Sequence, residues 1–71
     1  MSLKAELQVE GKSNDEYKAV IEKKLNGIDG VNNYNIDQKS KKVKVTYDDT
    51  KINLVDIKGT IMEEGFSVIE I

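Results

Sequence analysis

Hydrophobic and polar residues alternate along two stretches of the chain, and this alternation predicts two half-buried β-strands. Residues 3–9 place an apolar residue at every odd position, and residues 43–47 do the same. Residues two apart in a strand point to the same face, so each stretch has one apolar face and one polar face. Shorter alternating segments predict a strand at residues 33–37 and a last strand with Phe66, Val68 and Ile71.

In two other segments the apolar residues recur at steps of three and four, which predicts two amphipathic helices. The apolar stripe of the first contains Tyr17, Val20, Ile21 and Leu25, and that of the second contains Leu54, Ile57, Ile61 and Met62. We expect Met62 to fill a gap in the core. Gly59 inside the second helix predicts either close packing against a neighbour or a weak point in the helix.

Both predicted helices carry capping residues at their ends. Ser13 and Glu16 have the spacing of a capping box before the first helix, and Asn53 can cap the second. Gly27 follows the first helix and Gly65 the second, where a left-handed glycine commonly ends a helix.

The predicted elements follow the order β-α-β-β-α-β. Two split βαβ units in tandem give a ferredoxin-like α+β sandwich, with a four-stranded antiparallel sheet and two helices on one face. In this topology we expect the first and third strands to be central, and both show clean alternation. The 71 residues allow a single domain, residues 1–71.

The composition excludes several classes of partner and ligand but does not indicate a particular function. The net charge is −2 and all eleven cations are lysine, so we expect no nucleic-acid partner and no bidentate arginine contact. Cysteine and histidine are absent, which excludes a disulfide and removes the usual ligands of zinc and copper. No apolar run is long enough to insert into a membrane, and we expect a cytoplasmic protein.

Three activities known on this topology lack their residues here. The RNA-recognition motif needs exposed aromatic residues on its third strand, but Tyr47 shares the apolar face with Val43 and Val45. Acylphosphatase-like chemistry depends on an arginine, which this chain lacks. Acid–base catalysis needs a pair of carboxylates in a cleft, whereas the paired carboxylates of this chain are adjacent in sequence and tend to point apart. We therefore predict that the protein is not an enzyme.

Several segments, in this order and at this spacing, resemble the heavy-metal-associated domain of copper chaperones and metal-pumping ATPases. The segments are Leu7-Gln8-Val9-Glu10-Gly11, Val20–Leu25, Asp29-Gly30-Val31, Val43–Asp48 and Ile61–Phe66. They correspond to the family's first strand with its glycine, its first helix, the start of its second strand, its third strand and its Gly-aromatic pair. The resemblance covers nearly the whole chain and implies the same fold.

The chain departs from this family in the loop that carries its chemistry. That loop reads G-M-x-C-x-x-C in the family, and its two thiolates bind Cu(I). In this chain Lys12 replaces the methionine, Asn14 the first cysteine and Tyr17 the second. We therefore predict no metal site and no cofactor, and we take Lys12, Asn14, Tyr17 and Phe66 as a degenerate metal loop and a candidate docking surface.

The residues around this loop allow more than one interpretation. Asn14, Asp15 and Glu16 could offer oxygen ligands to a hard cation, although helix capping explains them better. Tyr17 could expose its ring to a partner, but we favour a ring at the edge of the core that meets Phe66. The hairpin cluster of Lys39, Lys41, Lys42 and Lys44 could meet an acidic partner, although a solvated turn is the commoner case.

The leading hypothesis is a heavy-metal-associated domain that has lost metal binding and keeps a protein-docking or regulatory role. Its partner would be another domain of this kind or a metal-transporting ATPase. The alternative is a copper-transport or chaperone protein that uses oxygen ligands or ligands shared with a partner. A third possibility is a purely structural module.

Overall fold

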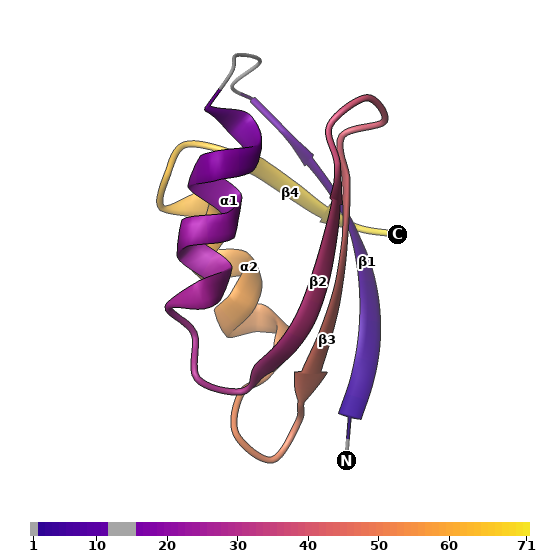
Figure 1. The fold of residues 1–71 in the computed structure, drawn as a ribbon, viewed down its shortest axis with the longest axis vertical. Coiled ribbons are helices and arrows are strands. Elements are labelled where there is room, and N and C mark those ends of the chain that lie inside the picture. Colours follow the sequence, from indigo (N-terminus) through magenta and orange to yellow (C-terminus); the bar gives the residue numbers. More distant parts are fainter. Residues whose placement is uncertain (1, 12–15) are drawn as a thin grey trace.

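The strands of the computed structural model form one antiparallel sheet in the order β2-β3-β1-β4, and both helices cover one face of it (Figure 1). The structure describes residues 2–11 and 16–71. The elements are β1 (Ser2–Glu10), α1 (Tyr17–Asn26), β2 (Val31–Asp37), β3 (Lys42–Asp48), α2 (Leu54–Met62) and β4 (Ser67–Glu70). The predicted ferredoxin-like sandwich is confirmed, with the first and third strands at the centre of the sheet.

The core lies between the sheet and the two helices, where the alternation of the strands meets the apolar stripes of the helices. Its buried side chains are Leu7, Val9, Tyr17, Ile21, Leu25, Val43, Val45, Tyr47, Ile57, Ile61 and Phe66. In the β1–β3 ladder Leu7 lies opposite Val43 and Ala5 opposite Val45. A shift of one residue would turn these side chains to the polar face, so the apolar pattern fixes the register.

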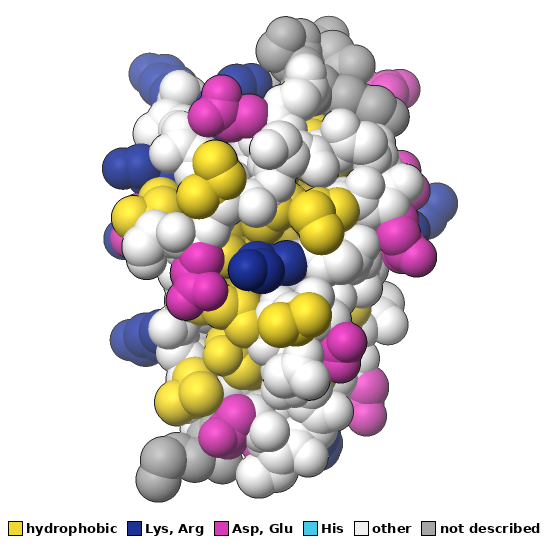
Figure 2. Space-filling view, turned by 180° about the vertical axis from the view of Figure 1, so that it is seen from behind, with side chains coloured by type: hydrophobic (Ala, Val, Ile, Leu, Met, Phe, Trp, Pro, Cys, Tyr) yellow, Lys and Arg dark blue, Asp and Glu magenta, His cyan; other side chains and the backbone are white. Residues whose placement is uncertain are grey.

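A second group of apolar side chains stays at the surface. The exposed large apolar residues are Leu3, Val55, Met62, Ile69 and Ile71. Figure 2 shows the side of the molecule formed by α2 and the β4 edge of the sheet, where hydrophobic side chains gather around a central basic side chain. Apolar side chains therefore reach the surface on this side of the molecule.

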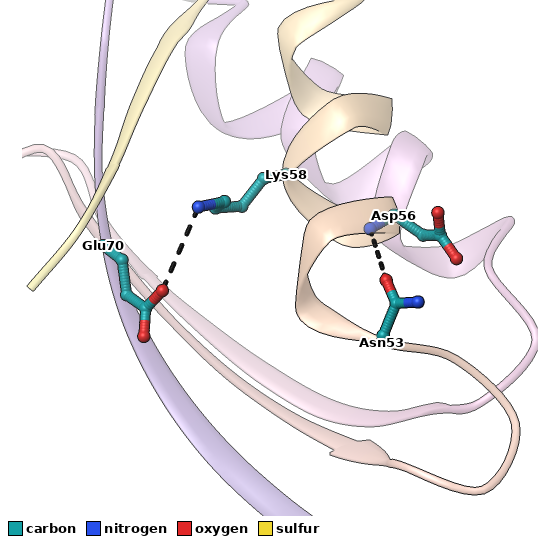
Figure 3. Close-up of polar contacts among 4 residues, drawn as sticks. All are labelled: Asn53, Asp56, Lys58 and Glu70. Carbon is teal, nitrogen blue, oxygen red and sulfur yellow. Dashed lines mark hydrogen bonds and ion pairs between the residues drawn. The ribbon is translucent and has the colours of Figure 1, made fainter.

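Helix α2 is fixed at both its start and its middle. The Asn53 Oδ1 atom accepts a hydrogen bond of 2.9 Å from the backbone N–H of Asp56, as expected for an N-cap residue (Figure 3). The Lys58 ammonium lies 3.9 Å from the Glu70 carboxylate and joins α2 to β4 (Figure 3). This ion pair is partly exposed, so it contributes little to stability.

Gly27 does not end α1 in the predicted left-handed conformation. Its φ is −83°, and its backbone N–H bonds to carbonyls of the last helical turn. The left-handed glycine is Gly30, with φ of +107°. A Cβ atom there would lie 2.9 Å from Cγ2 of Ile52, so close approach to this side chain requires glycine. The left-handed glycine is therefore Gly30 and not Gly27, and β2 begins directly after it, at Val31, two residues before the predicted strand.

The start of α1 also differs from the prediction. Helix α1 begins at Tyr17 with Glu16 at its N-cap, and among residues 2–11 and 16–71 no side-chain hydrogen bond caps this end. The capping box predicted Glu16 at the third helical position instead. Its other member, Ser13, lies outside the described residues.

Met62 and Ile71 lie in different environments from those predicted, and Gly59 fits only the weak-point alternative. Met62 is 48% exposed, so it does not fill the core. Gly59 is not closely packed, because a Cβ atom there would meet nothing within 4 Å. Ile71 follows β4 and is exposed. Helical spacing alone did not show that the stripe of α2 ends at Ile61.

Candidate functional site

The candidate site lies where β1 leads to α1, at the end of the molecule where the α2–β4 turn also lies (Figure 1). Gly11 ends β1 with a φ of +140°, a conformation that side chains rarely allow. A Cβ atom at Gly11 would lie 3.1 Å from the carbonyl oxygen of Gly65 and 3.3 Å from Cα of Phe66. The two turns are therefore in direct backbone contact, which brings Phe66 to the start of α1.

Tyr17, the first residue of α1, fills the space beneath these turns. Its exposed fraction is 0%, and its hydroxyl donates a buried hydrogen bond of 2.8 Å to the carbonyl oxygen of Val9 on β1. The Phe66 ring meets it edge to face, with ring centroids 5.6 Å apart and an interplanar angle of 89°. This geometry is favoured for aromatic pairs and adds about 0.5–1.5 kcal/mol to their burial.

Lys41, in the turn between β2 and β3, closes the other side of the Tyr17 ring. Its ammonium lies 4.5 Å from the ring centroid, within the range of a cation–π contact. Its carbonyl oxygen accepts a hydrogen bond of 2.9 Å from the N–H of Val9. Val9 thus bonds through its N–H to the hairpin and through its carbonyl to Tyr17, so three segments meet at one residue.

The Tyr17 phenol is held in its protonated form. Burial is the main cause that raises its pKa, and the carboxylates of Glu10 and Asp37 raise the pKa further. A phenolate would lose the hydrogen bond to Val9 and would be placed among carboxylates. The phenol oxygen is therefore a donor fixed in the structure and not an available anionic ligand.

Comparison with known proteins identifies the family. The heavy-metal-associated domain matches residues 6–67. The chain belongs to this family. The copper chaperone CopZ of Staphylococcus aureus (strain JH9) is 36% identical over 63 residues, which cover 89% of this chain and 93% of that protein.

Solved structures support the same assignment for this heavy-metal-associated domain. The structure named CopZ metallochaperone is 34% identical, has a TM-score of 0.86 and covers 94% of this chain and 100% of its own. The N-terminal domain of a potential copper-translocating P-type ATPase from Bacillus subtilis, solved in its Cu(I)-loaded state, is 30% identical. Its TM-score is 0.90, and the match covers 99% of this chain and 88% of that one.

The donor set of this heavy-metal-associated domain does not suit Cu(I). Soft Cu(I) is held in proteins by thiolate, imidazole or thioether ligands. The sequence contains no cysteine or histidine, and its two methionines, Met1 and Met62, are not in the loop between β1 and α1. At the position that resembles the second thiol, the structure has the bonded phenol of Tyr17. Among residues 2–11 and 16–71, no group of three or more Asp and Glu side chains is placed to hold a metal ion.

The predicted site residues fall into two groups. Tyr17 and Phe66 meet as expected, with exposed fractions of 0% and 5%, so both rings form the interior of the site and not its outer surface. Lys12, Asn14 and Asp15 lie outside the described residues, and with them most of the proposed oxygen-ligand set. The docking surface at this loop stays a prediction.

Sequence reasoning missed the role of Lys41 in this heavy-metal-associated domain. It treated Lys41 as one lysine of a solvated hairpin cluster, and the structure shows it half-buried over Tyr17. Lys39, Lys42 and Lys44 are exposed as expected. No local pattern marks Lys41, because its contacts come from segments distant in sequence. Its positive φ of 60° distinguishes it only once the backbone is known.

None of the helices in the described part of the chain combines the length and the apolar character that a membrane span requires.

Proposed function

We propose that this heavy-metal-associated domain does not bind copper and acts as a protein-docking or regulatory module. The observation that carries the proposal is Tyr17, which stands at the second thiol position and is completely buried there. Its hydroxyl is bonded to Val9 and its ring packs against Phe66. An aromatic plug thus occupies the space that a ligand would need.

The energetic cost of reopening this space supports the proposal. A metal ion held at the Tyr17 position would require the ring to leave, which gives up its burial and its bond to Val9. Loss of a buried aromatic side chain costs about 3–5 kcal/mol in proteins. The absence of cysteine leaves no thiolate to offset that cost.

The kinds of protein found among the relatives are consistent with a docking role. One curated relative is a copper chaperone and one structural relative is a domain of a potential copper-translocating ATPase. We propose that this chain binds another heavy-metal-associated domain, either free or within a metal-transporting ATPase, in the cytoplasm. Without cargo of its own, it would occupy the partner's surface and so regulate access to it.

Competition for Cu(I) tests the loss of metal binding. The purified chain is titrated into a Cu(I)–bicinchoninate solution, and the metal content of the protein as purified is measured in parallel. We expect the chelator's absorbance to stay unchanged and the protein to contain no stoichiometric copper. Stoichiometric removal of Cu(I) by the isolated chain would overturn this proposal and favour the copper-binding alternative.

Docking is tested separately with a ¹⁵N-labelled chain and a purified heavy-metal-associated domain of a metal-transporting ATPase. We expect saturable shifts in the amide signals of Gly11, Glu16 and Gly65, which surround the Tyr17 plug. Bovine serum albumin at the same concentration serves as the control protein. If no amide responds at millimolar partner, the docking proposal is wrong even where copper binding is absent.

A further inference from the structure

Strand β1 has an edge that β4 covers along only part of its length. Ser2 to Gln8 pair with β3 on one side, whereas β4 pairs on the other side with Leu7 to Glu10. The last backbone bond on the β4 side runs from the N–H of Ile71 to the carbonyl oxygen of Glu6, at 2.9 Å. Among the described residues, the segment Ser2–Ala5 therefore has a ladder partner on one side only.

The backbone groups that face this open edge follow from the alternation of an antiparallel strand. Glu6 directs its carbonyl toward β4, and Val9 directs its N–H toward Lys41 on the hairpin side. Residues two apart point the same way. The N–H and C=O groups of Ser2 and Lys4 are thus aimed at the open edge, while those of the odd residues bond to β3.

The two faces of this edge differ in character. Leu3 and Ala5 lie on the helix-facing side, since they share the parity of buried Leu7, and Leu3 is 40% exposed. Lys4 points to the opposite, polar face and carries the single charge of the segment Ser2–Ala5.

We propose that this edge binds an extended acidic peptide, which adds to the sheet as a fifth strand antiparallel to β1. An unpaired strand edge recognises an extended chain through main-chain hydrogen bonds, and side chains give the specificity. The peptide places apolar side chains beside Leu3 and Ala5 and a carboxylate opposite Lys4. Opposite charges directly across a strand pair are favourable.

The same chemistry disfavours a second copy of the chain at this edge. A two-fold axis at Lys4 would set two ammonium groups directly opposite each other, which is destabilising. A two-fold axis at Leu3 would place Lys4 opposite Ser2, with no carboxylate to meet it. The edge lies at the far end of β1 from Gly11 and Tyr17, so this inference does not depend on the proposed function.

The test uses two capped pentapeptides, Val-Glu-Val-Glu-Val and Val-Lys-Val-Lys-Val, and amide hydrogen exchange of the full ¹⁵N-labelled chain. We expect the glutamate peptide to slow exchange at Lys4 and to leave Ala5 unchanged. At a peptide concentration of about five times Kd the exchange slows about sixfold, because only the free chain exchanges. The lysine peptide should not protect Lys4.

Charge reversal gives a second and independent readout. Lys4→Glu should reverse the preference for peptide charge, so that the lysine peptide protects the variant and the glutamate peptide does not. Lys18→Glu, at an exposed position on α1, is the matched control and should keep the original preference. The proposal is overturned if Lys4 gains no protection, if protection ignores peptide charge, or if it rises with protein concentration alone, which would indicate a second copy.

Discussion

The hydroxyl of Tyr17 offers the sharpest test of how the degenerate loop is held. Tyr17→Phe keeps the ring, and with it the contacts to Phe66 and Lys41, but removes the donor that lies 2.8 Å from the carbonyl oxygen of Val9. A buried acceptor that loses its partner costs about 1–3 kcal/mol. We expect Tyr17→Phe to lower the free energy of unfolding by about 1.5 kcal/mol, because the Val9 carbonyl keeps its position beside the hairpin and loses this donor.

The chain contains a matched control for this substitution. Tyr34 donates its hydroxyl to Oδ1 of Asn26 at 3.0 Å, in an exposed bond where water can replace the lost partner. Tyr34→Phe should therefore cost about 0.5 kcal/mol or less. Urea unfolding followed by circular dichroism gives both values, provided that the m-value is unchanged. At about 4–8 °C per kcal/mol, Tyr17→Phe lowers the Tm by about 6–12 °C.

Equal losses in the free energy of unfolding for the two substitutions would refute this interpretation of the Tyr17 hydroxyl.

The pH dependence of stability gives a second test of the same bond. Burial raises the pKa of the Tyr17 phenol above its ordinary value of 10.0, so the unfolded chain loses this proton first. The stability that the protonated phenol contributes is complete below about pH 10 and is lost as pH rises through the folded-state pKa. The stability difference between the natural chain and Tyr17→Phe should thus shrink above about pH 10.

Further predictions concern the turns and helix ends. Gly59→Ala should raise the free energy of unfolding by about 1 kcal/mol, because the added Cβ meets no atom within 4 Å, whereas Gly11→Ala should lower it. Asn53→Ala should cost about 1 kcal/mol in urea unfolding through loss of the N-cap bond. The hydroxyl of Thr50 lowers the pKa of Asp48 below its ordinary 3.8. The stability that the Asp48 carboxylate contributes is therefore lost as pH falls through that lowered pKa. Asp48→Asn should therefore reduce the fall in urea midpoint below about pH 4, and an unchanged fall would contradict this.

The fold could be predicted because its determinants are local and repeat along the chain. The alternation at residues 3–9 and 43–47 specified which face of each strand is buried, and the ladder of Leu7 with Val43 agrees with it. The cap at Asn53 was also readable, because an N-cap bond spans only one helical turn. These patterns need no knowledge of the distant parts of the chain.

Features that depend on distant neighbours could not be predicted in the same way. Position 30 requires glycine because its φ is positive and because Ile52 packs against it, and that contact joins the start of β2 to the segment before α2. Met62 fits the helical spacing of an apolar stripe but points to solvent. Spacing gives the face of a helix, whereas the width of the buried stripe depends on what packs against it.

The candidate site contains features that the sequence could predict and features that depend on distant segments. The family resemblance and the aromatic residues predicted that Tyr17 and Phe66 would meet, and they form an edge-to-face pair. The bond from Tyr17 to Val9 and the position of Lys41 over the ring were not predictable, since both depend on how the turns converge. The structure thus explains how the ring is held as well as where it lies.

The central claim is that a buried tyrosine replaces a metal ligand on an otherwise intact scaffold. The most direct measurement compares Cu(I) competition for the natural chain with that for the double variant Asn14→Cys with Tyr17→Cys, under reducing conditions. Asn14→Ser with Tyr17→Ser is the control of similar side-chain size without thiols. The account predicts stoichiometric Cu(I) binding by the cysteine variant alone. Copper binding by the natural chain, or none by a folded cysteine variant, would contradict it.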